Sequence, residues 1–212
     1  MNYSQIARVV GTSLLAVGLI IATGCGKKVA TPAPVETLKN LQTAFNGESN
    51  AHAMYAAFAE KADEEGYGKA ASLFRAASMA ESIHAANHAK VIRSMGAEPK
   101  AEVKLPEIQT TAENLATALT GETYERITMY PDFLKQAQAD GSDSAVQTFS
   151  WALTAEKEHA KFYQAALDDL PNWKEGTKVF IVCQRCGYTT DNLGLTKCPV
   201  CGEPKEKLKE VS

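Results

Sequence analysis

The stretch TAEKEHAKFY, from Thr154 to Tyr163, contains the pair of residues that decides the fold. Its composition is helical, and Glu156 and His159 lie three residues apart within it. Residues with this spacing share one face of a helix. That face also carries Phe149 and is otherwise apolar, so a carboxylate and an imidazole fall where a helix normally buries hydrocarbon.

Four segments have the 3.6-residue periodicity of amphipathic helices. They span about residues 36–65, 69–95, 110–139 and 144–170. Short connections join the first two segments and the last two, whereas residues 96–110 form a longer connection that contains two prolines. This pattern predicts a four-helix bundle with one long crossover.

Acids and histidines interrupt the apolar face of every segment. Glu48 lies in the first segment, and the third contains Glu122 and Glu125. The second segment contains another ExxH pair, Glu81 and His84. Burying even one ion costs several kcal/mol, which bound metal ions offset. One ExxH pair is weak evidence, because most such pairs lie on solvated faces. The order Glu, ExxH, Glu, ExxH on four apolar faces predicts a site for two metal ions, as in ferritin-like di-iron proteins.

Four other residues lie close to these predicted ligands. His52 and His88 lie beside the apolar stripes without completing a ligand motif, so we expect ordinary surface or hydrogen-bonded histidines. Tyr55 and Tyr130 lie within two helical turns of a ligand. They are either core aromatics or donors of hydrogen bonds to the ligands, and we expect them to be donors that help to bind the cofactor.

A second metal motif follows the helices. Two CxxC pairs, separated by eleven residues, are formed by Cys183, Cys186, Cys198 and Cys201. Paired CxxC units of this kind are typical of a tetrahedral four-thiolate site. Disulfide bonds are the alternative, since an exported chain meets oxidising conditions. Thiolate geometry does not separate zinc from iron, but an electron-transfer iron has a purpose beside a redox di-metal site.

The first 24 residues differ from the rest of the chain. An apolar run from about residue 9 to 22 follows Arg8 and ends in small residues before Cys25, as in a secretory signal. The ATGC end resembles the lipobox of bacterial lipoproteins, although Ala22 stands where leucine is usual. We therefore predict a signal segment at 1–24, lipidation of Cys25 and a flexible tether at 25–35. Ordinary signal cleavage and an uncleaved membrane anchor are the alternatives.

Composition and charge narrow the possible partners. The chain has 212 residues, of which 45% are hydrophobic and 22% are charged, with a net charge of −3. It contains no basic run, so nucleic acid is not an expected partner. The N-terminal prediction places the protein in the cell envelope, as a membrane lipoprotein that faces the periplasm and is held by its lipid anchor.

The motifs FNGESNAHAMY, AESIH, ENLATALTGETYERITMYP, AEKEHAKFY and CQRCGY…CPVCGEP together resemble the rubrerythrin family. The resemblance covers about residues 36–212. It implies a mainly α fold, with a ferritin-like di-iron domain at 36–170 and a small rubredoxin-like Fe(Cys)4 β domain at 178–212. The cofactors implied are two non-haem irons and one cysteine-bound iron. The implied ligands of the di-iron site are Glu48, Glu81, His84, Glu122, Glu125, Glu156 and His159.

The resemblance also implies an activity. Rubrerythrins are di-iron peroxidases that reduce hydrogen peroxide to water in oxidative stress defence, with electrons relayed through the Fe(Cys)4 site. Glu125 and His84 would be the catalytic pair, because one iron exchanges the first for the second on reduction. The family also implies a homodimer in which each rubredoxin-like domain lies next to the partner's di-iron site. For an exported chain, a c-type cytochrome or a quinol-linked protein is the expected donor. The alternatives are a ferroxidase that handles iron and an inert, membrane-tethered metal-binding module.

Overall fold

The computed structural model describes residues 34–212. The predicted signal segment and Cys25 lie outside the described residues, as does the predicted tether except for Pro34 and Val35. Val35 is already the first residue of a helix. The helices, in chain order, are α1 (Val35–Glu64), α2 (Gly68–Ser94), α3 (Thr111–Tyr124), the π-helix η1 (Glu125–Met129), α4 (Tyr130–Ala139) and α5 (Asp143–Asp168). Two 3₁₀ turns lie C-terminal to these helices, η2 (Leu170–Trp173) directly after α5 and η3 (Lys205–Lys207) within the last ten residues described.

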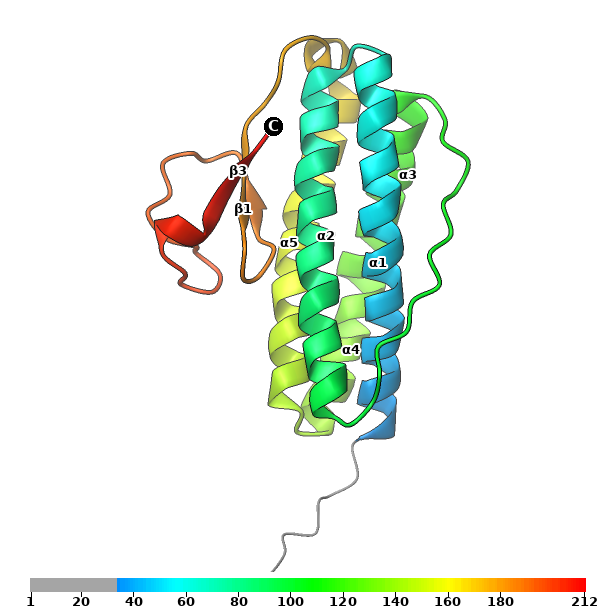
Figure 1. Ribbon diagram of the computed structural model, residues 1–212, viewed down its shortest axis with the longest axis vertical. Coiled ribbons are helices and arrows are strands. Elements are labelled where there is room, and N and C mark those ends of the chain that lie inside the picture. The colour runs from blue at the N-terminus through cyan, green and yellow to red at the C-terminus, as the bar shows by residue number, and fades with distance from the viewer. Residues whose placement is uncertain (1–33) are drawn as a thin grey trace, which may run out of the picture. The chain divides into compact units, whose positions relative to one another are not determined.

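The helices form the predicted four-helix bundle, in which α3, η1 and α4 together make the third helix (Figure 1). Tight turns join α1 to α2 and α4 to α5. They contain Gly66 and Gly141, whose φ angles are +78° and +64°. Such backbone is strained for any residue with a side chain, which explains why glycine occurs there. None of the helices in the described part of the chain is both long enough and apolar enough to span a membrane.

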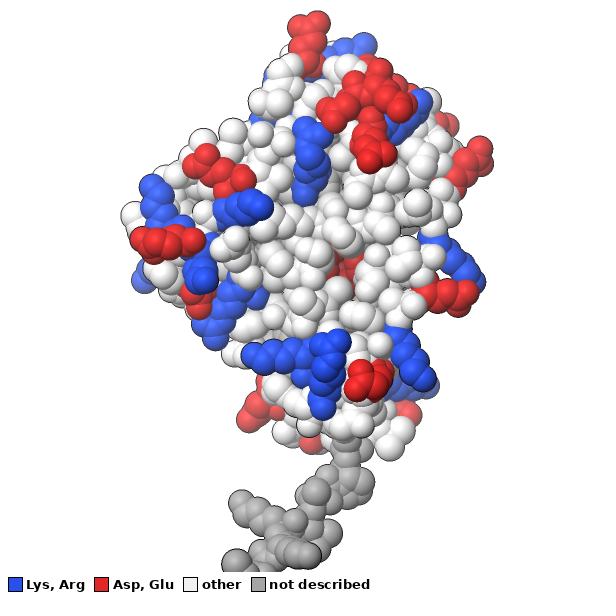
Figure 2. Space-filling model, in the orientation of Figure 1, with Lys and Arg blue, Asp and Glu red and all other residues white. Residues whose placement is uncertain are grey.

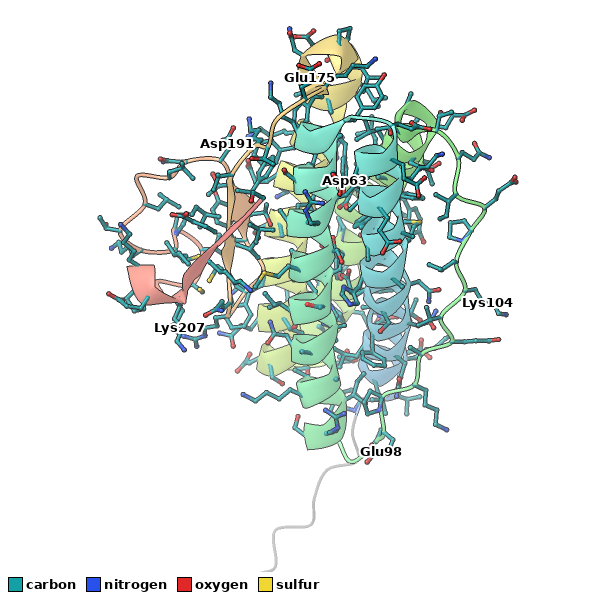
Figure 3. All side chains as sticks on the ribbon, turned by 45° about the horizontal axis from the view of Figure 1, so that its top comes forward. Asp63, Glu98, Lys104, Glu175, Asp191 and Lys207 are labelled. Atoms are coloured by element: carbon teal, nitrogen blue, oxygen red, sulfur yellow. The ribbon has the colours of Figure 1, made fainter. Side chains whose placement is uncertain are left out.

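The crossover between α2 and α3 runs in extended form beside α1 (Figure 1). Gln42, Asn46 and Asn50 lie four residues apart on one face of α1 and bind the backbone of this segment. The amide oxygens of Asn46 and Asn50 each accept a backbone N–H at 2.8 Å, from Glu102 and Lys104 respectively. Figure 3 labels Lys104 on this segment. Side-chain amides thus satisfy the backbone groups that an isolated extended strand leaves unpaired.

The third helix differs from the prediction of one regular helix. It begins with the capping box that the spacing of Thr110 and Glu113 predicts. It then widens into the π-helix η1, where the backbone N–H of Tyr130 bonds to the carbonyl of Glu125, five residues back. Pro131 follows at the start of α4 and has no N–H to donate, so the regular ladder is interrupted at this point.

The apolar core is divided by the polar residues of the helices. One cluster, around Phe58, Phe74 and Tyr163, lies on one side of the carboxylates, and a second, around Leu41 and Phe149, lies on the other. The acids and histidines therefore occupy a layer in the middle of the bundle, enclosed by hydrocarbon above and below. Charged side chains of both signs are dispersed on the face shown in Figure 2.

A small sheet follows the bundle and packs on it. Strands β1 (Phe180–Cys183), β2 (Thr189–Thr190) and β3 (Leu208–Val211) are antiparallel, in the order β2-β1-β3. Phe180 and Val182 belong to the same core cluster as the helical residues, and the ring centroids of Phe162 and Phe180 are 5.2 Å apart. The predicted mainly α fold, a four-helix bundle followed by a small β unit, is thus confirmed. The four cysteines lie within this unit, which we call the four-cysteine unit (residues 178–212).

Candidate metal centres

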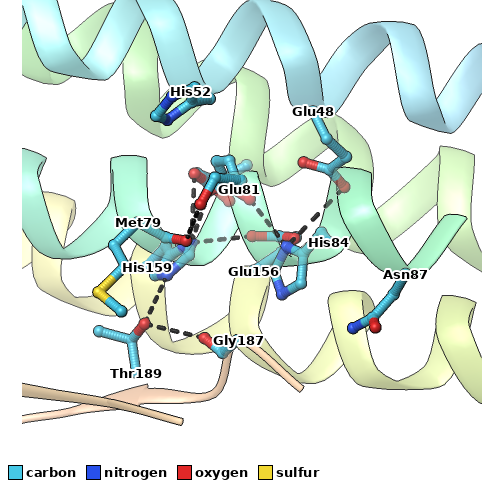
Figure 4. Close-up of polar contacts among 12 residues, drawn as sticks. Glu48, His52, Met79, Glu81, His84, Asn87, Glu156, His159, Gly187 and Thr189 are labelled. Atoms are coloured by element: carbon cyan, nitrogen blue, oxygen red, sulfur yellow. Dashed lines mark hydrogen bonds and ion pairs between the residues drawn. The ribbon is translucent and has the colours of Figure 1, made fainter. Parts of the chain in front are cut away.

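Six of the seven predicted bundle ligands meet in the polar layer. Figure 4 labels all of them except Glu122. They form two groups of four, in which the ligand atoms lie within 4.8 Å of one another. The first group is Glu48, Glu81, His84 and Glu156, and the second is Glu81, Glu122, Glu156 and His159. Every one of these side chains is at most 1% exposed.

The two groups share the carboxylates of Glu81 and Glu156, the two acids of the ExxH pairs. A carboxylate has two oxygens, so each shared acid can offer one oxygen to each group. The remaining members, Glu48 with His84 and Glu122 with His159, belong to one group each. The arrangement is that of a di-metal site with two bridging carboxylates and two terminal pairs.

The Nδ1 atoms of the two imidazoles face the carboxylates. His84 Nδ1 lies 2.8 Å from Glu81 Oε2 and 3.2 Å from Glu156 Oε1. His159 Nδ1 lies 2.9 Å from Glu156 Oε2 and 3.1 Å from Glu81 Oε1. Each Nδ1 is thus surrounded by oxygens from at least two helices, the position that a metal-ligating nitrogen requires.

Burial perturbs the carboxylates strongly. It raises the pKa of Glu48 and Glu156 well above the usual range, and the charges of neighbouring acids act in the same direction. Burial alone would also raise the pKa of Glu81, but His159 and His84 outweigh it and lower the pKa of that group. Two carboxyls of the layer therefore favour the protonated form without a metal, whereas the shared Glu81 favours the ionised form.

The pKa values of both imidazoles are raised, although burial alone would lower them. Burial would lower the pKa of His84, but a hydrogen bond to Glu81 outweighs it and raises the pKa. The pKa of His159 is raised well above its usual value, because the charges of Glu122 and Glu81 outweigh burial. Metal ions that bind here displace protons, because ligating nitrogens and carboxylates must be deprotonated.

Unpaired oxygens show that the layer suits cations. Glu48 Oε2, Glu122 Oε2 and Glu156 Oε1 are buried and have no hydrogen-bond partner. A buried polar atom without a partner costs about 1–3 kcal/mol, and more when it is charged. Two divalent cations would satisfy these atoms and neutralise the carboxylates, and a carboxylate and imidazole donor set suits iron, manganese or zinc.

The two tyrosines predicted near the ligands make the expected hydrogen bonds. Tyr55 donates to Glu122 Oε1 at 2.7 Å, and Tyr130 donates to Glu48 Oε1. Both side chains are at most 2% exposed. Each terminal glutamate is thus held by a phenol from another helix, which fixes its orientation.

Glu125, the seventh predicted ligand, lies beside the site but outside both groups of four. It is the first residue of the π-helix and is half-buried. Burial, and then the charges of Glu122 and Glu81, raise the pKa of its carboxyl group. Its Oε1 lies 3.9 Å from the position that a Cβ on Gly47 would occupy. Single turns of π-helix are frequent at functional sites, where they redirect a side chain.

The cysteines of the four-cysteine unit lie together as free thiols. The sulfur of Cys183 is 3.5 Å from that of Cys201, and the sulfur of Cys186 is 3.6 Å from that of Cys198. Disulfide sulfurs are about 2.0 Å apart, so these are not disulfide pairs. Four sulfurs about 2.3 Å from one metal ion have edges of roughly 3.8 Å, close to the observed separations.

The thiols differ in their acidity. A hydrogen bond from the Cys186 thiol lowers the pKa of Cys183 to about 5, although burial opposes it. Burial raises the pKa of Cys201 to about 11. A cation at the centre of the cluster would hold all four sulfurs as thiolates.

The four-cysteine unit touches the bundle at both histidine ligands. Thr189 Oγ1 lies 3.0 Å from His159 Nε2 and donates a hydrogen bond to the carbonyl of Gly187 at 3.1 Å (Figure 4). Because the threonine has one proton to donate, it accepts from His159 Nε2–H. This leaves Nδ1 as the nitrogen that faces the carboxylates and serves as ligand.

Gly187 lies against the other histidine. A Cβ added to this glycine would lie 2.2 Å from His84 Nε2, so only glycine permits the approach. A further hydrogen bond, from Asn87 Nδ2 to the carbonyl of Arg185, spans 2.8 Å. One chain therefore brings its own four-cysteine unit against its own carboxylate layer. The predicted homodimer, with this contact made between subunits, stays a prediction.

Sequence reasoning missed two contributors, namely Thr189 and Gly187 as a contact residue. Thr189 is 30 residues from His159 in the chain, so no local pattern connects them. The glycine after CxxC indicates a tight turn, not a contact with a helix. The position of His88, four residues after His84, places it on the same helix face as that ligand. It is fully buried and hydrogen-bonded, one of the alternatives expected for it.

Comparison with known proteins agrees with this geometry. A family model described as Rubrerythrin matches residues 39–167. Nigerythrin of Nitratidesulfovibrio vulgaris is 39% identical over 173 residues, which are 80% of this chain and 84% of nigerythrin. Rubrerythrin-2 of Clostridium acetobutylicum is 36% identical over 172 residues, or 80% of this chain and 93% of that protein.

Solved structures give the same picture. Nigerythrin in its fully reduced, all-ferrous state has a TM-score of 0.76 at 36% identity, covering 88% of this chain and 91% of that chain. A bacterioferritin of Desulfovibrio desulfuricans, 23% identical, has a TM-score of 0.61 and covers 65% of this chain and 81% of its own. The second likeness shows a shared fold.

Proposed function

This chain belongs to the rubrerythrin family, and on that premise we propose that it is a peroxidase that reduces hydrogen peroxide to water in oxidative stress defence. The observation that carries the proposal is the contact of Thr189 and Gly187 with the two histidine ligands. A four-thiolate centre pressed against a di-metal site suits a redox enzyme, whereas iron storage needs no such centre.

We propose iron for both centres. The nigerythrin structure is described as all ferrous, and the donor sets here suit the same metal. Glu48, Glu81, His84, Glu122, Glu156 and His159 would hold the di-iron pair, with Glu125 as an exchanging ligand, and the four cysteines would hold the third iron. The two bundle irons would supply one electron each to the O–O bond. The cysteine-bound iron would return these electrons one at a time.

The chain's own residues prepare the site for this chemistry. The reaction consumes one peroxide, two electrons and two protons and gives two waters. Tyr55 and Tyr130 hold the terminal carboxylates in place. The apolar clusters on both sides exclude water from the layer. Thr189 keeps a proton on Nε2 of His159 and so reserves Nδ1 for the metal.

The ferroxidase and the inert metal-binding module are the rival functions. Anaerobically reduced protein should be oxidised by one equivalent of peroxide faster than by oxygen, with iron staying near three per chain. Uptake of many irons per chain with oxygen as the preferred oxidant would overturn the peroxidase proposal. Absence of oxidation by either would favour the inert module. A red oxidised protein would support iron in the four-cysteine unit, and a colourless one with zinc would overturn it.

The proposed location is the cell envelope, with the protein held by lipid on Cys25. The support is the apolar segment and lipobox-like end of the sequence. The sequence has no glycine-rich dinucleotide fingerprint, so an electron-carrying donor such as a c-type cytochrome is proposed to reduce the four-cysteine centre. Fractionation of wild type and Cys25→Ser tests the anchor. Wild type in the cytoplasm, or anchoring that survives the substitution, would refute it.

A further inference from the structure

His88 is a fully buried histidine that the proposed metal chemistry leaves without a role. Its Nε2 lies 3.1 Å from the hydroxyl of Tyr130, and its Nδ1 lies 3.0 Å from Thr148 Oγ1. Tyr130 in turn donates to Glu48 Oε1. Three side chains from three helices thus form one continuous hydrogen-bonded chain that ends on a predicted metal ligand.

The other end of this chain reaches the surface. Thr148 is 3% exposed and lines a surface cavity of about 370 Å³. Polar groups of Ser144, Gln147 and Lys90 also line that cavity. Between its ends the path is enclosed, since the ring of His88 lies 5.4 Å from that of Phe149 and 6.0 Å from that of Tyr130, measured between centroids.

The directions of the hydrogen bonds follow from the donors available. As a metal ligand, Glu48 carries no proton, so the single hydroxyl proton of Tyr130 points to Glu48. The phenol oxygen must then accept from His88 Nε2–H. The ring of His88 is fully buried among aromatic side chains, which disfavours its charged form, so the ring is neutral and has one N–H. Its Nδ1 is therefore bare and accepts from the hydroxyl of Thr148.

We propose that Thr148, His88 and Tyr130 form a proton path from the surface cavity to Glu48. The inference rests on the proposed peroxidase function, because peroxide reduction consumes two protons in a site closed to water. In one passage, a hydronium ion in the cavity gives a proton to Thr148 Oγ1 and becomes water, and the threonine proton moves to His88 Nδ1. The Nε2 proton moves to Tyr130, and the phenol proton moves to Glu48 Oε1. One passage thus delivers one proton to Glu48 and leaves the proton of His88 on Nδ1.

His88 acts through Tyr130 and does not touch substrate, so it is a positioning residue in this path. A purely structural role is the alternative, because a buried histidine with two hydrogen bonds also stabilises a core. The two roles differ in what they predict for proton transfer. Loss of a structural histidine changes stability, whereas loss of a relay slows a step that is sensitive to deuterium.

The test compares His88→Phe and Thr148→Val with His52→Phe, a change at an exposed histidine whose ring is hydrogen-bonded to Ser78 and lies apart from the path. In reduced, iron-loaded protein, both path variants should reduce peroxide more slowly, by roughly 10²-fold as for loss of a positioned proton donor. Both should show a larger solvent isotope effect than wild type, with three irons per chain retained. The control should match wild type. Thr148→Val keeps the shape of the side chain, so it tests the path even if His88→Phe does not fold.

A second measurement is independent of turnover. In zinc-loaded protein, ¹⁵N NMR should find His88 neutral, with its proton on Nε2. A proton on Nδ1, or a doubly protonated ring, would overturn the path. Path variants with wild-type rates and isotope effects would overturn it as well. Wild-type protein without peroxidase activity would instead overturn the proposed function, and the NMR result would still decide the direction of the hydrogen bonds.

Discussion

The Nε2 atom of His159 lies 3.0 Å from the hydroxyl oxygen of Thr189, so a residue of the four-cysteine unit fixes the tautomer of a histidine in the bundle. The metal-facing nitrogen of His159 is therefore set by a side chain that the bundle does not contain.

Replacing Thr189 by valine should weaken metal binding in the bundle. The substitution leaves His159 Nε2–H buried without an acceptor, which costs about 1–3 kcal/mol in stability. Loss of a partner that orients a ligand typically lowers metal affinity by about 10–100-fold. Zinc titration and thermal unfolding of the metal-free protein measure the two effects.

Thr190→Val is the matched control for this change. Thr190 is also buried in strand β2, but its hydroxyl accepts from the backbone of Asn192 and not from a ligand. The zinc affinity of the Thr190→Val variant should equal that of wild type. Equal losses in both variants would show that the strand, and not the hydrogen bond to His159, supports the site.

Metal binding should weaken as the pH falls, and the decline should begin above the range of ordinary carboxylate sites. The pKa of Glu48 and Glu156 is raised by burial, and the pKa of His84 and His159 is raised by the surrounding acids. Raised pKa values mean that these groups hold protons at a higher pH, and a metal ion must displace them.

Calorimetric titration with zinc in buffers of different ionisation enthalpy measures both the zinc affinity and the number of protons released per zinc. As the pH falls towards the ordinary histidine pKa of about 6.5, affinity should already fall and the number of protons released per zinc should rise, because the pKa of His84 and His159 is raised above that value. Affinity that does not change over this range of pH would show that the ligands are already deprotonated in the metal-free protein.

Glu125→Ala should keep two metal ions in the bundle and slow peroxide reduction. Glu125 lies outside both groups of four, so its loss leaves each group complete. Its role in the rubrerythrin resemblance is to exchange with His84, which affects turnover and not occupancy. Iron analysis and stopped-flow oxidation by peroxide separate these effects. Glu122→Ala, which removes a member of the second group, should lose metal. If turnover in Glu125→Ala equals that of wild type, ligand exchange is not used in this protein.

The sequence predicts the bundle well because the evidence, polar residues at helical spacing on an apolar face, is local and recurs in every helical segment. Glu156 and His159 are placed on one face by helical spacing alone, and the same holds for Glu81 and His84. The paired CxxC spacing likewise predicts the thiolate cluster. The π-helix at Glu125 was not predictable, because it depends on how the third helix fits against its neighbours. Long-range contacts had no sequence signal, since neither Thr189 nor Gly187 has a spacing that relates it to a histidine.

Gly187→Ala should separate the four-cysteine unit from the bundle. The added Cβ would lie 2.2 Å from His84 Nε2, which is too close for any contact, so either the imidazole or the β1–β2 turn must move. The φ angle of +78° is unfavourable for alanine as well. Two causes of destabilisation are therefore present, and a control must isolate the clash.

Gly202→Ala provides that control within the same unit. Gly202 follows Cys201 as Gly187 follows Cys186, and its φ angle is +76°. A Cβ there meets nothing within 4 Å. Both variants carry the same backbone strain of about 1–2 kcal/mol, but only Gly187→Ala adds the clash. Urea unfolding should give a greater loss of stability for Gly187→Ala, and reduced cysteine-bound iron should transfer electrons to the bundle more slowly in that variant alone. Equal losses in the two variants, with equal transfer rates, would mean that the contact between Gly187 and His84 is not maintained in solution.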